Sequence, residues 1–259
     1  MPFVILVLLL SGCARAMGGI TVAGSTSVQP FAELVAEEYV ALYPAERINV
    51  QGGGSSAGIE AALSGAAQIG MSSRELKGEE RQLIWIEIAR DAIAVVVHPS
   101  NPIHDLSVEQ VRGIFSGQIT RWSEVGGPPR PIVVVTREEG SGTRGAFQEM
   151  VMGKADVDPG ALVQDSNGAV RQLVSGDASA IGYISLGLVN REVKPVALGG
   201  VEPTVENVAA GQYKLVRPFL FVLKSPPEGA TKAFVDYVLG LEGQRALAHE
   251  GLLPPSAER

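Results

Sequence analysis

The chain has 259 residues, of which 46% are hydrophobic and 19% charged, a balance typical of a soluble globular protein with one large or two modest domains. Its net charge of −7 excludes nucleic acid and anionic membrane surfaces as binding partners. The single cysteine excludes an intrachain disulfide, and the scattered histidines give no support to a metal site. We expect a monomer without a cofactor.

The N-terminus predicts a signal peptide over residues 1–13 and a tether over 14–19. Its apolar run, residues 2–10, is too short to span a bilayer but suits a signal-peptide core. The sequence Leu-Ser-Gly-Cys that ends at Cys13 resembles a bacterial lipobox, although no Lys or Arg precedes the apolar run. We expect Cys13 to be lipidated and to anchor the protein to a membrane, in the periplasm or at the cell surface. The ordinary alternative is a chance cysteine after an apolar segment.

Beyond the tether, strand and helix patterns alternate along the chain. A strand at 20–23 precedes a helix around 31–39, and a strand at 48–51 precedes a helix that opens at 59–63. A strand buried on both faces follows at 92–98, then a helix at 108–115, a strand at 132–136 and a helix at 143–152. The alternation continues through 170–175 and 183–188 to a strand at 215–223 and a helical region at 231–249. This order predicts an α/β protein with mostly parallel sheets.

Two extended segments, 92–99 and 215–224, are candidates for crossings between two lobes. On that interpretation lobe I comprises residues 19–94 plus 219–259, and lobe II comprises residues 95–218.

Three short loops rich in Gly, Ser and Thr each lie between a strand and a helix, at residues 24–27, 52–56 and 140–143. A helix N-terminus has backbone N–H groups without internal partners and carries partial positive charge, so each loop is suited to an anion. Simple helix capping by Ser and Thr is the ordinary alternative for any one loop. Three such loops in one chain favour an anion site.

Arg137 follows a predicted buried strand and precedes the third loop. A guanidinium there is suited to hold a tetrahedral oxyanion through two hydrogen bonds. The ordinary alternative is an ion pair with Glu138 or Glu139, and Glu139 is the carboxylate that we expect to orient Arg137.

These motifs resemble those of the periplasmic phosphate-binding proteins of bacterial phosphate ABC transporters. The similarity runs from about Ile20 to Leu252 and rests on several motifs in order: AGSTSVQPF at 23–31, QGGGSSAG at 51–58, IGMSSRE at 69–75, ITRWSEVGG at 119–127, REEGSGTR at 137–144, SNGAV at 166–170 and AIGY at 180–183.

The resemblance implies a two-lobed, type II-like periplasmic-binding-protein fold that is not an enzyme. Such a protein closes on inorganic phosphate and delivers it to a transporter permease. Carried over by motif, the phosphate-binding residues of this chain are Thr26, Ser27, Ser55, Ser73, Arg137, Ser141, Gly142 and Thr143.

One position departs from the family pattern. Many members have an aspartate where this chain has Ser73, and a carboxylate there accepts the phosphate proton and repels sulfate. Sulfate or molybdate therefore stays an alternative ligand, and Glu75 or Glu139 is the candidate for the missing acceptor.

Two motif matches point elsewhere. Residues 54–58 fit Gly-x-Ser-x-Gly, so a serine esterase would use Ser56 with Asp165 or Asp236 and His249. Residues 140–145 fit the dinucleotide fingerprint Gly-x-Gly-x-x-Gly, but Glu138 and Glu139 would oppose a pyrophosphate. Neither alternative explains all three loops.

Overall fold

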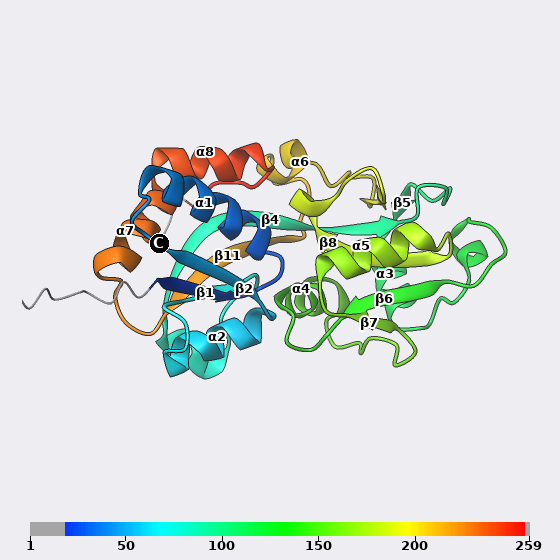
Figure 1. Cartoon of the computed structure of the whole chain (residues 1–259). Helices are drawn as coiled ribbons and strands as arrows, with labels where there is room; N and C mark the ends of the chain where they lie inside the picture. Colours follow the sequence, from blue (N-terminus) through cyan, green and yellow to red (C-terminus); the bar gives the residue numbers. More distant parts are fainter. Residues whose placement is uncertain (1–18, 257–259) are drawn as a thin grey trace, which may run out of the picture.

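The computed structural model describes residues 19–256 and shows an α/β protein of two lobes lying side by side (Figure 1). The predicted signal peptide, Cys13 and the tether up to residue 18 lie outside the described residues. Strands of both lobes are joined in the order β2-β1-β3-β11-β4-β8-β6-β7, with β9 also paired to β4. Within residues 19–256, no helix is both long and apolar enough to cross a membrane.

Lobe I is built on three parallel strands. β1 (Ile20–Gly24) lies between β2 (Ile48–Gly52) and β3 (Ile69–Ser72). The helices α1 (Gln29–Leu42), α7 (Gly229–Leu239) and α8 (Leu241–His249) pack together on one side, and α2 (Ser55–Ser64) covers the other (Figure 1). Phe31, Phe219 and Phe234 are among the buried residues of this core.

Lobe II repeats the arrangement around β6 (Val133–Arg137), which is parallel to both β7 (Leu162–Gln164) and β8 (Ala180–Ser185). Its helices are α3 (Val108–Phe115), α4 (Gly142–Phe147), α5 (Asn167–Gly176) and α6 (Val205–Ala209). Short strands complete it: β5 (Asp105–Leu106), β9 (Lys194–Pro195) and β10 (Ala197–Leu198). Phe147 stacks on Tyr183 at 4.0 Å between ring centroids in the core of this lobe.

Two long strands run between the lobes. β4 (Ile84–Val97) pairs with β11 (Val216–Leu223) up to Ala92, and with β8 from Ile93 onward. All antiparallel pairings of this sheet involve β4 or β11. The other strand pairs of the sheet, which lie within one lobe, are parallel. A register shift between Phe219 and Leu220 leaves Ile88 of β4 without a partner in β11.

Several elements differ in extent from the predicted ones. β4 begins at Ile84, whereas the predicted strand began at 92. The first half was not predicted because polar side chains at Glu87 and Asp91 interrupt the apolar run that marks a buried strand. The helical region at 231–249 is two helices, since Gly240 takes an extended conformation with φ −74° and ψ 175°. The helix predicted to end at 152 leaves the α conformation after Phe147 and finishes in a π-helical turn, Gln148–Met152.

Candidate functional site

The three Gly/Ser/Thr loops meet where the lobes touch. The first leads from β1 into α1, the second from β2 into α2, and the third from β6 into α4. Gly54 precedes α2 with φ 86° and ψ 158°, a positive-φ conformation that glycine adopts without strain, and no side chain caps this helix. Hydroxyls and helix N-termini from both lobes therefore lie together where the lobes touch. We call this contact, formed by residues 24–27, 52–56 and 140–143, the seam.

Simple capping accounts for only part of this chemistry. Ser141 caps α4, because its Oγ accepts a hydrogen bond from Arg144 N at 3.2 Å. Ser25 Oγ accepts from Ser27 N at 3.2 Å in the first loop. Neither α1 nor α2 has a side-chain cap, so the hydroxyls of Ser27 and Ser55 serve another purpose.

Direct contacts across the seam join residues predicted for the site. Ser27 Oγ lies 2.7 Å from Thr143 Oγ1, and Arg137 Nη2 donates to Thr26 Oγ1 at 3.1 Å. The backbone closes the second and third loops together, since Ser56 N donates to Gly140 O at 3.1 Å. The structure thus describes the lobes in contact.

Gly142 lies against the hydroxyls of lobe I. A Cβ built at this residue would be 2.1 Å from Ser55 Oγ and 2.5 Å from Ser73 Oγ, closer than any side chain tolerates. Only glycine lets the start of α4 approach these two serines. Ser73 Oγ in turn accepts from Ser25 Oγ at 2.8 Å, and Ser55 Oγ accepts from Ser73 N at 3.0 Å.

Arg137 ends β6 and is only 1% exposed. Its Nε and Nη2 each donate at 3.0 Å to Glu138, and Nη2 also donates to Asp165 O at 3.0 Å. Its Nη1 is fully buried and has no partner among the described residues. A buried cationic donor without an acceptor is costly, so this atom marks a place for an anionic ligand.

The expected role of Glu139 is wrong. Glu138 is the carboxylate that orients Arg137, because it lies on the side of the chain that faces the guanidinium, whereas Glu139 is exposed. Glu75 is exposed as well. Neither Glu75 nor Glu139 takes the place of the missing aspartate.

A buried ion pair that the sequence patterns did not reveal lies beside this seam. Asp91 of β4 and Arg217 of β11 are directly paired across the strands, at 2.9 Å between Asp91 Oδ2 and Arg217 Nη2. Burial raises the pKa of the Asp91 carboxyl, and the nearby guanidinium opposes that rise. Arg217 Nη1 donates to Thr143 Oγ1 at 2.8 Å, so the pair is linked to the predicted site.

Asn167 was missed too, although it lies in one of the motifs that carry the resemblance. Its Nδ2 donates to Ser27 Oγ at 2.8 Å, and its Oδ1 accepts from Ser185 N at 3.1 Å. The signal that could have identified these residues is polarity at positions where the surrounding strand or motif is otherwise apolar.

The structure does not assemble the esterase triad. Ser56 is exposed on α2, and its Oγ accepts a hydrogen bond from Arg74 Nη2 at 3.3 Å. His249 lies on α8, on the opposite side of the lobe I sheet, with its side chain 88% exposed (Figure 1). The loop that fits the dinucleotide fingerprint contacts lobe I instead of standing open, with Gly140 O accepting from Ser56 N and Gly142 lying against Ser55 and Ser73.

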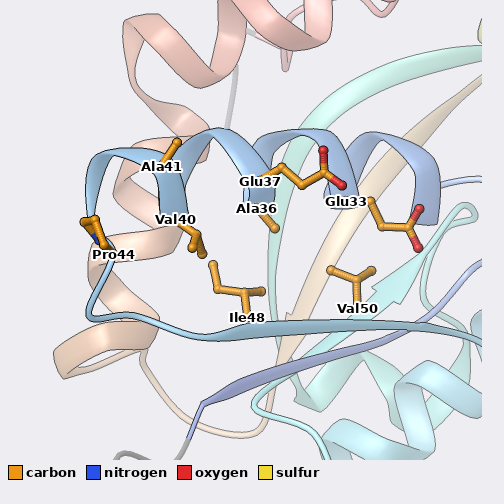
Figure 2. Close-up of a pocket in the computed structure, with 8 residues that line it drawn as sticks. All are labelled: Glu33, Ala36, Glu37, Val40, Ala41, Pro44, Ile48 and Val50. Carbon is orange, nitrogen blue, oxygen red and sulfur yellow. The ribbon is translucent and has the colours of Figure 1, made fainter.

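Two surface hollows differ in their relation to the site. One, of about 370 Å³, adjoins Arg137 at the outer end of the seam and is lined by Thr26, Gly53, Glu138 and Asp165, among others. A larger groove of about 590 Å³ lies between α1 and β2, with Glu33 and Glu37 beside apolar residues (Figure 2). Its lining has carboxylates and no cationic or hydroxyl group, so it does not suit an anion. The residues from 19 to 256 hold no cluster of metal ligands.

Comparisons with known proteins agree with this geometry. The family model of the PBP superfamily domain matches residues 11–242. Phosphate-binding protein PstS of Bacillus subtilis is 31% identical over 94% of this chain and 83% of its own length. PstS of Pseudomonas aeruginosa is 31% identical over 93% of this chain and 84% of its own length.

Solved structures extend the similarity to three dimensions. A phosphate ABC transporter substrate-binding protein from Clostridium perfringens, crystallised with bound phosphate, is 45% identical with a TM-score of 0.89, covering 92% of this chain and 100% of its own. An ABC-type phosphate transport receptor from Vibrio cholerae is 39% identical with a TM-score of 0.77, covering 91% and 100%. The chain therefore belongs to the PBP superfamily and, within it, to the PstS-like phosphate-binding proteins.

Proposed function

We propose that this protein captures inorganic phosphate between its two lobes and delivers it to the permease of an ABC transporter. The observation that carries the proposal is the buried, unpartnered Nη1 of Arg137, a guanidinium whose Nη2 contacts the Thr26 hydroxyl of the facing lobe at 3.1 Å. The relatives named for phosphate binding and phosphate transport support the choice of ligand.

The hydrogen-bond directions of the site favour an anion. Ser27 Oγ already accepts from Asn167, and Thr143 Oγ1 accepts from Arg217. Ser55 Oγ accepts from Ser73 N in the same way. Each of these hydroxyls accepts from a donor of the protein and keeps its own hydrogen to donate, so the hydrogen that Ser27 and Thr143 share can turn to an oxyanion when one is bound. We assign phosphate contacts to Thr26, Ser27, Ser55, Ser73, Arg137, Ser141, Gly142 and Thr143.

Discrimination between phosphate and sulfate must rest on hydroxyls. Both oxygens of Asp91 are engaged, Oδ2 by Arg217 and Oδ1 by Ser185 Oγ at 2.9 Å, so this carboxylate is not available to the phosphate proton. Ser73 Oγ keeps a lone pair for that proton but does not repel sulfate. We therefore propose that this site is less selective against sulfate than one with an aspartate at position 73.

Capture by closure explains why the site is divided between lobes. We place the boundaries at 94/95 and 218/219, so that Ser27 and Thr143 meet only when lobe I and lobe II come together. The ligand then gains hydrogen bonds that neither lobe makes alone, in a setting from which water is excluded.

The remaining part of the proposal concerns the cell envelope. We propose that the protein is a monomeric, non-catalytic receptor held near its permease by a lipid on Cys13. Replacing Cys13 with serine is expected to move the protein from the membrane fraction to the soluble fraction, and an unchanged distribution would contradict the anchor.

Thermal unfolding tests the ligand directly. A ligand that binds only the folded protein stabilises it by about 2.7 kcal/mol at a concentration one hundred times its dissociation constant. We expect the unfolding temperature to rise steadily with phosphate, and to stay constant when chloride replaces phosphate at equal ionic strength. No phosphate-dependent rise would contradict the proposed function.

A further inference from the structure

Six buried residues form a closed circuit of hydrogen bonds around the crossing strands, in which every link joins two side chains except that from the backbone N of Ser185 to Asn167. Each is at most 3% exposed, and each contacts the next at 2.7–3.1 Å: Asp91, Ser185, Asn167, Ser27, Thr143 and Arg217, which returns to Asp91. The circuit draws on both crossing strands, on lobe I through Ser27, and on lobe II through the other three. It therefore connects the hinge region with the candidate site.

Arg217 is the member of the circuit that links the hinge to both lobes. Its Nε and Nη2 donate to Asp91 Oδ2 at 3.1 and 2.9 Å. Its Nη1 donates to Ser73 O of lobe I at 3.2 Å and to Thr143 Oγ1 of lobe II at 2.8 Å. An arginine has a rigid fork of donors that can make these contacts together, whereas a lysine cannot.

The circuit fixes the direction of the hydroxyls that it contains. A guanidinium can only donate, so Thr143 Oγ1 must accept from Arg217. The amide of Asn167 is oriented by Ser185 N on its Oδ1, so its Nδ2 donates to Ser27 Oγ. The hydrogens of Ser27 and Thr143 are left for each other or for an anion at the seam.

We propose that Arg217, anchored by Asp91, is a positioning residue for anion capture. It orients the Thr143 hydroxyl toward the ligand, and its contacts with Ser73 and Thr143 hold the two lobes together. This inference rests on the proposed function for the identity of the ligand, but the holding of the lobes does not depend on phosphate.

A purely structural ion pair would not require this arrangement. A buried pair of charges often adds nothing to stability compared with apolar residues of similar volume. Removing one partner alone leaves an uncompensated buried charge, which is strongly destabilising. The test therefore removes both charges at once, by Asp91→Asn combined with Arg217→Met.

The first measurement is a double-mutant cycle on phosphate affinity, read by calorimetry. Thr143→Val is made in the native chain and in the paired variant. We expect Thr143→Val to weaken binding about tenfold in the native chain and less than about twofold in the paired variant, because the hydroxyl there has lost its orientation. An equal loss in both backgrounds would overturn the positioning role, since an ion pair that only stabilises the fold would not change it.

The second measurement is small-angle X-ray scattering without phosphate. We expect the paired variant to have a larger radius of gyration than the native protein, because it has lost the contacts that hold the lobes together. Equal radii would overturn the holding role. A larger radius together with a native protein that does not bind phosphate would reject the proposed function and keep the role of Arg217 at the hinge.

Two controls separate charge and surface effects. Arg217→Lys keeps the charge but not the fork, so we expect it to behave like the paired variant in affinity. Arg171→Met removes an ion pair with Glu192 at 3.1 Å, in which both side chains are at least 31% exposed. We expect Arg171→Met to leave the phosphate affinity and the radius of gyration unchanged. Native phosphate affinity in Arg217→Lys would contradict the proposal.

Discussion

The sharpest consequence of the site concerns Arg137. Arg137→Met removes the buried Nη1 donor together with the charge, and keeps much of the apolar stem. A hydrogen bond to a charged group contributes about 1.5–3 kcal/mol, and each 1.4 kcal/mol changes a dissociation constant tenfold. We therefore expect phosphate affinity to fall by about tenfold to one hundredfold.

The same substitution should leave the fold intact. Glu138 loses its partner, but its side chain is 31% exposed and water can solvate it. We expect the unfolding temperature without phosphate to change by only a few degrees. Titration calorimetry measures the affinity, with Arg245→Met on the surface of α8, where the side chain is 67% exposed, as the matched control. Native affinity in a folded Arg137→Met variant would refute the assignment of the site.

Three further predictions follow from individual residues. Gly142→Ala should weaken phosphate binding at least about tenfold, because the new Cβ collides with Ser55 Oγ when the lobes are in contact; calorimetry measures the affinity, and thermal unfolding checks that the variant is folded. Ser56→Ala should leave phosphate affinity within about twofold, because Ser56 is exposed; a larger loss would show that its hydroxyl takes part in binding. Arg74 lowers the pKa of Glu80, so this pair stabilises the fold above the ordinary glutamate pKa of about 4.3, and the stability is lost as the pH falls through the lowered value; Glu80→Gln should therefore reduce the loss of stability in acid, measured by denaturant unfolding.

Local signals made most of the architecture predictable. The alternation of strands and helices, and the three loops at helix starts, depend on residues close in sequence. For this reason the α/β class and the helix at 108–115 could be predicted without the structure. Arg137 was identifiable because it stands at the end of an apolar strand and just before a glycine-rich loop.

The rest depends on partners far apart in the chain. Asp91 and Arg217 are 126 residues apart, and each resembles an ordinary polar residue next to an apolar run. Which of Glu138 and Glu139 orients Arg137 is decided by the turn after β6, and the loop sequence does not determine its direction. The break at Gly240 was equally hidden, because the apolar pattern continues on both sides of it.

One titration tests the central claim most directly: the purified protein is titrated by calorimetry with phosphate and then, separately, with sulfate at neutral pH. The account predicts saturable phosphate binding at one site per chain, with measurable but weaker sulfate binding, because hydroxyls and not a carboxylate meet the ligand. The absence of measurable sulfate binding is the result expected of a site with an aspartate at position 73, and it would contradict the role assigned to Ser73. Absence of phosphate binding would contradict the account as a whole.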